Sequence, residues 1–121
     1  MKRLMPAAAA LLIATGALAH GPSKGPHGGP KVDAGDYHVE MVAKDTLLAV
    51  YINDEDDKPI DVKGYKAIGI FVVGGKPQRI ELSPESANKL AGASAVPLPA
   101  NLKGAVQIKL PSGKTVQAKF N

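Results

Sequence analysis

The sequence YHVEMVAKDTLLAVYI, residues 37–52, contains two runs of β-type residues separated by a polar pair. In the first run, every second residue from Tyr37 to Ala43 points to one face, which is the alternation of a half-buried strand. Lys44-Asp45 forms a tight turn, and residues 47–52 form the second run. The segment therefore predicts an antiparallel hairpin that contributes Met41 to the core.

Further β-type runs follow toward the C-terminus, each bounded by turn residues. Residues 65–73 end at Gly74-Gly75, a pair typical of hairpins because both glycines accept positive φ. Residues 78–82, 105–110 and 114–120 are also β-type, and the last two alternate across a turn. Ser83-Pro84 predicts the start of a short helix. In the alternative, residues 88–91 form a short strand.

These runs predict an all-β domain over residues 36–121, with about six or seven antiparallel strands. We expect a small immunoglobulin-like β-sandwich, with a small barrel as the alternative. The preceding residues 20–35 contain five glycines, three prolines and two histidines. Such a segment has little apolar surface to bury, so it predicts a flexible N-terminal tail.

Residues 1–19 have the features of a signal peptide. Lys2 and Arg3 precede an apolar run, and the small residues that end at Ala19 are typical of a cleavage site. The apolar run is shorter than the roughly 20 residues that span a bilayer. We therefore expect export to the periplasm, a mature N-terminus at His20, and no membrane span after cleavage.

Composition excludes several classes of function. The chain has no cysteine, which excludes disulfides, thiolate metal ligands and a cysteine nucleophile. Its formal charge of +4 includes Lys2 and Arg3, and the other basic residues are scattered, so nucleic acid is not an expected partner. Phosphate-binding loops, nucleophile elbows and zinc-binding helix motifs are also missing from the sequence. We expect no enzymatic activity.

The stretch Pro26-His27-Gly28-Gly29-Pro30 predicts a metal site. The His27 imidazole can anchor Cu(II), and the amides of Gly28 and Gly29 can deprotonate to complete a set of nitrogen and oxygen ligands. Tetragonal coordination of this type suits Cu(II) or Ni(II). The stretch resembles the Pro-His-Gly-Gly copper-binding repeats of prion proteins. We expect a divalent transition metal, with Cu(II) favoured over zinc or nickel.

His20 provides a second candidate ligand, because cleavage would place its free amine and its imidazole on one residue. Pro22 has no N–H, so chelation by successive backbone amides would stop after Gly21. A flexible linker would let His20 and His27 bind one ion. The alternative interpretation is an inert, solvated linker.

His38 lies two residues before Glu40, so both are expected on the strand face opposite Val39. His38 is a further candidate metal ligand, although a solvent-facing polar row is the favoured interpretation of the pair. The four carboxylates of residues 54–57 lack the glycine of a calcium loop, so they predict a solvated turn.

The order of Gly25-Pro-His-Gly-Gly29, Gly35-Asp-Tyr-His-Val-Glu40 and a β-rich stretch carrying residues 54–60 also supports a family resemblance. It is similar to small exported bacterial proteins related to the N-terminal domain of periplasmic adaptor subunits of heavy-metal efflux pumps. The resemblance implies a role in periplasmic metal handling and heavy-metal resistance, with His27 as the best-matched ligand and an envelope efflux component as a partner. The chain lacks the methionine or cysteine clusters of copper-specific members, which argues against Cu(I). The alternative function is a non-catalytic interaction module of the cell envelope without a metal role.

Overall fold

The computed structural model describes residues 23–121, and its regular elements are all β-strands. In chain order they are β1 (Ser23–Lys24), β2 (Pro30–Ala34), β3 (Tyr37–Lys44), β4 (Leu47–Asp54), β5 (Lys66–Val73), β6 (Lys76–Ser86), β7 (Lys89–Ala93), β8 (Gly104–Lys109) and β9 (Thr115–Phe120). The predicted signal peptide and His20 lie outside these residues. Across residues 23–121, no helix has the length and apolar character needed to cross a membrane.

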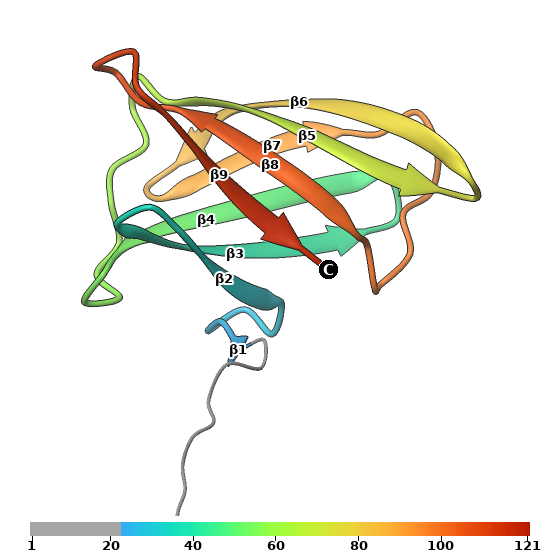
Figure 1. The fold of residues 1–121 in the computed structure, drawn as a ribbon, viewed down its shortest axis with the longest axis horizontal. Coiled ribbons are helices and arrows are strands. Elements are labelled where there is room, and N and C mark those ends of the chain that lie inside the picture. The colour runs from blue at the N-terminus through green and yellow to red at the C-terminus, as the bar shows by residue number, and fades with distance from the viewer. Residues whose placement is uncertain (1–22) are drawn as a thin grey trace, which may run out of the picture.

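The nine strands form one antiparallel sheet in the order β1-β2-β3-β4-β7-β6-β5-β8-β9. Strand β6 joins the two halves of this sheet, because its first part pairs with β5 and its last part pairs with β7. The sheet curls into a half-barrel, and β2 comes to lie beside β9 (Figure 1). The core fills the space between the two halves.

The antiparallel all-β class is confirmed, but the expected six or seven strands are nine. The immunoglobulin-like sandwich is not confirmed, because β6 continues from one half to the other and makes one curled sheet. The helix predicted at Ser83 is wrong. Ser83 and Pro84 are instead part of β6 and pair with Ala91 and Leu90, which confirms the alternative strand near residues 88–91.

Residues 23–35 also differ from the flexible tail that composition predicts for residues 20–35, and residues 20–22 lie outside the described part. Residues 30–34 form β2 and pair with β3, and β1 pairs with β2 in turn. Ala34 is buried and Val32 packs against the core, so even this glycine-rich segment contributes apolar contacts. The Pro-His-Gly-Gly stretch is therefore the turn of a β-hairpin.

The core follows the alternation expected from the sequence. Met41 is buried as predicted, and the C-terminal hairpin also contributes its expected faces. The largest fully buried side chains are Phe71, Leu48, Ile52, Ile80, Leu90, Ile108, Val39, Val50, Val62 and Val106. Full burial of a side chain of this size stabilises the fold by about 1.5–3 kcal/mol, so this core holds both halves together.

Candidate functional site

Glu40 is the one buried carboxylate in the described part of the chain, with 3% of its surface exposed. It lies on β3 between Val39 and Met41, which point to the core, so its own side chain is on the outer face. The β1–β2 turn covers it there. Gly25 packs so closely on the carboxyl group that a Cβ at that position would collide with it.

Glycines allow the turn to fold tightly over Glu40. The Gly25 N–H donates to the Gly29 carbonyl at 2.8 Å, and the Gly28 N–H donates to the Gly25 carbonyl at 3.0 Å. Gly28 has φ of 84°, a conformation in which glycine is favoured. Gly29 approaches the Met41 carbonyl closely enough that a Cβ would collide with it. The close approach of the turn to the sheet therefore needs glycine at positions 25 and 29, and the positive φ favours it at position 28.

The Glu40 carboxylate accepts three hydrogen bonds from this turn. Its Oε2 accepts the backbone N–H groups of His27 and Gly29, each at 2.9 Å. Its Oε1 lies 2.8 Å from Nδ1 of the His27 ring. Because carboxylate oxygens accept, Nδ1 acts as the donor and carries the ring proton. In the neutral imidazole, the remaining ring nitrogen, Nε2, then keeps its lone pair.

The His27 ring is also held by an aromatic contact. It stacks on Tyr51 with 3.7 Å between the ring centroids and 9° between the planes. Tyr51 lies on β4 directly opposite Glu40, so one pair of neighbouring strands supplies both contacts. The His27 side chain nevertheless remains 43% exposed. The imidazole is thus fixed in orientation and open to solvent, which suits a ligand for an external ion.

His38 belongs to a second, separate group of charges. Its Nδ1 lies 2.7 Å from Asp57 and its Nε2 lies 3.3 Å from Asp33. Lys31 contacts Asp57 at 3.1 Å. Hydrogen bonds from His38 and then from Lys31 hold the pKa of Asp57 below its usual value of 3.8. Both ring nitrogens of His38 therefore already have carboxylate partners.

The predicted site residues are thus only partly brought together. His27, Gly28 and Gly29 share one turn, whereas His38 faces a different set of side chains, and His20 lies outside the described residues. Across residues 23–121, no group of three or more histidine, aspartate or glutamate side chains could hold a metal ion. Among the described residues, His27 is the oriented imidazole whose second nitrogen has no carboxylate partner.

Sequence reasoning missed the role of Glu40, which it assigned to a solvent-facing row. That interpretation is wrong for Glu40, because the glycine turn covers the carboxylate and satisfies it. The available signal was the pattern of glycines around His27, since a segment that can approach a strand closely can also bury a polar side chain on it.

Comparisons with protein-family models, with curated proteins and with solved structures found no match to this chain.

Proposed function

We propose that this chain is a periplasmic protein that captures, buffers or delivers a divalent transition metal, with Cu(II) favoured over zinc and nickel. The contact between Glu40 and Nδ1 of His27 carries the proposal. Histidines that bind metals commonly donate their other ring N–H to a carboxylate, which fixes the tautomer and raises the basicity of the ligand nitrogen. Nε2 of His27 is the nitrogen that would bind the ion.

His27 supplies one ligand, so the remaining positions must be filled from elsewhere. His20 is the first candidate, because cleavage after Ala19 would give it both an amine and an imidazole. It lies three residues before Ser23, where the described hairpin begins. Water or a group from a partner would complete the coordination, and the metal would be cargo that exchanges.

The binding mode favoured here differs from backbone chelation by the Pro-His-Gly-Gly stretch. In the described turn, the Gly29 N–H donates to Glu40 and the Gly28 N–H donates to Gly25. Deprotonation of both amides for copper would break both hydrogen bonds and open the turn. Binding through Nε2 of His27 needs no such change, so we favour it.

The resemblance to proteins related to periplasmic adaptor subunits supports the same function, because its motifs include both His27 and Glu40. Export by the proposed signal peptide would place the site in the periplasm. An envelope component of a metal-efflux system is the proposed partner, and heavy-metal resistance is the proposed physiological role.

Titration of the mature protein with Cu(II), followed by the visible d–d band, tests this function. We expect His27→Ala to weaken binding by at least about tenfold, as the loss of an oriented ligand should. His38→Ala is the matched control and should leave the affinity within about twofold, because the two histidines lie in separate groups. Unchanged affinity in a variant that lacks both His20 and His27 would rule out the site.

One observation favours the alternative, an interaction module without a metal role. Leu47 is 62% exposed and borders a hollow of about 390 Å³ on the outer face of β3, β4 and β7. Apolar surface of this kind can mark a protein interface. Retention of an envelope partner in the presence of a chelator, and by a His27→Ala variant, would favour this alternative over metal delivery.

A further inference from the structure

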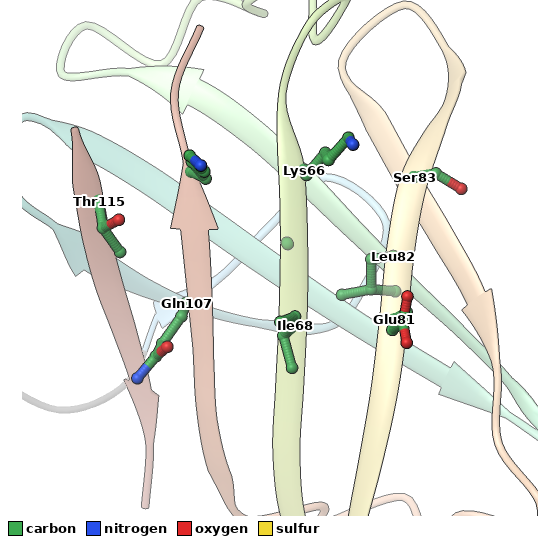
Figure 2. A pocket seen from close by; sticks show the side chains of 9 residues that line it. Lys66, Ile68, Glu81, Leu82, Ser83, Gln107 and Thr115 are labelled. Carbon is green, nitrogen blue, oxygen red and sulfur yellow. The ribbon is translucent and has the colours of Figure 1, made fainter. Parts of the chain in front are cut away.

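A second hollow, of about 450 Å³, lies on the opposite half of the sheet (Figure 2). It forms where β6 leaves β5. The two strands pair from Val73↔Lys76 up to Ala67↔Leu82, and from Ser83 onward β6 pairs with β7 instead. The hollow extends from this divergence across the outer faces of β8 and β9. Its size is within the range of about 300–1,000 Å³ for small-molecule sites.

Two lysines form one end of the hollow. Lys66 on β5 and Lys109 on β8 are direct partners in the antiparallel register. Like charges directly opposite each other are unfavourable in a sheet. Across residues 23–121, neither lysine has an acidic group within ion-pair distance. An anion bound near both lysines would offset this repulsion.

Neutral polar groups surround the same end. Thr115 on β9 lies opposite Lys109, and Ser83 also lines the hollow, whereas Gln107 lies opposite Ile68 at the other end. Figure 2 shows Lys66 extending toward β6, on which Ser83 lies. Hydroxyl groups can donate hydrogen bonds to an anion, and carboxylate and phosphate oxygens accept several at once.

The other end of the hollow is different in character. Ile68 follows Lys66 on the same outer face, and Ile70 beyond it is 46% exposed. Glu81 lies opposite Ile68 and places a negative charge there. A second anionic group would be repelled at this end, whereas an aliphatic chain would cover the isoleucines.

We propose that this hollow binds a small organic anion with one carboxylate or phosphate head and a short aliphatic body. Lys66 and Lys109 bind the head, and the body lies along Ile68 toward Ile70. This site is independent of the proposed metal site, which lies on the other half of the sheet. Its failure would leave the function proposed for His27 unaffected.

Calorimetric titration with octanoate, octyl phosphate and inorganic phosphate tests the proposal. We expect both amphiphiles to bind, and inorganic phosphate to bind at least about tenfold more weakly because it cannot bury an alkyl chain. Lys109→Gln should weaken the binding of octyl phosphate by about tenfold or more. Lys119→Gln is the matched control, since Lys119 lies on the same face opposite Ala105, and it should change the affinity by less than about twofold.

Thermal unfolding at low salt provides a second readout. Lys109→Gln should raise the melting temperature without ligand, because it removes the repulsion from Lys66, and it should abolish the rise that octyl phosphate causes in the wild type. The proposal is overturned if neither amphiphile binds at millimolar concentration. Equal losses of octyl phosphate affinity in Lys109→Gln and Lys119→Gln would also overturn it. Binding to phosphatidylglycerol vesicles without binding to free octyl phosphate would do the same.

Discussion

His27 and His38 each contact a carboxylate, but the two carboxylates differ in burial. Glu40, the partner of His27, is 3% exposed, whereas Asp57 and Asp33 beside His38 are 50% and 84% exposed. The turn donates two backbone N–H groups to Glu40, so its position is fixed from several sides. The aspartates of His38 are held mainly by side chains in contact with solvent.

The difference indicates what each histidine can do. Among residues 23–121, one ring nitrogen of His27 has a buried acceptor and the other has no hydrogen-bond partner, which is the arrangement of an oriented ligand. Both nitrogens of His38 lie near carboxylates, so this ring is suited to link β2, β3 and the loop at Asp57. A histidine's neighbours therefore matter more than its presence in a histidine-rich motif.

The largest effect is expected when Glu40 is replaced. Glu40→Ala would leave the two backbone N–H groups and the His27 ring without their acceptor, which should lower the free energy of unfolding by about 3 kcal/mol. Urea denaturation measures this loss. Glu81→Ala is the control, because that carboxylate is 80% exposed and its removal should change stability by less than about 0.5 kcal/mol.

Equal urea midpoints for Glu40→Ala and Glu81→Ala would show that the covered carboxylate does not hold the turn. The contrast between the two histidines would then be lost. Glu40→Gln sharpens the experiment, because it keeps the size and an acceptor oxygen while removing the charge. It should fold and bind Cu(II) about ten- to a hundredfold more weakly.

A smaller, pH-dependent effect is expected at His38. The lowered pKa of Asp57 means that its ionised form is favoured by folding. Its contribution to stability is therefore present above its unfolded value of 3.8 and is lost as the pH falls through the lower folded value. Asp57→Asn should be less stable than the wild type at pH about 5, and the difference should disappear in stronger acid.

Urea midpoints of both proteins across this pH range measure the effect, at low and at high salt. Salt should reduce the difference, because the pair is exposed and screened. A wild-type advantage that persists in strong acid would contradict the assignment to Asp57 ionisation.

The sequence predicted the strands more successfully than their assembly. Alternation identified the β3–β4 and β8–β9 hairpins, and Gly74-Gly75 identified the turn between β5 and β6. The continuation of β6 past Pro84 was missed, since Ser-Pro is a strong local signal for a helix start. Pairing with β7, a tertiary contact, overrides that signal.

The candidate site was likewise predicted only in part. His27 was identified from its local motif, but its partners Glu40 and Tyr51 are 13 and 24 positions away in the sequence. Only the β2–β3–β4 pairing brings them to the turn. Composition also predicted a flexible segment here. It cannot show that the buried Glu40 carboxylate accepts hydrogen bonds from the turn.

The most direct measurement is the ¹⁵N spectrum of the histidine side chains at neutral pH, before and after addition of diamagnetic Zn(II). We expect His27 to carry its proton on Nδ1 in the free protein. On metal addition, the Nε2 resonance should shift to that of a metal-bound nitrogen. The Nδ1 proton should remain, still donated to Glu40. Metal binding at Nδ1, or unchanged His27 resonances with Zn(II) bound to the protein, would contradict the role that we assign to the buried carboxylate.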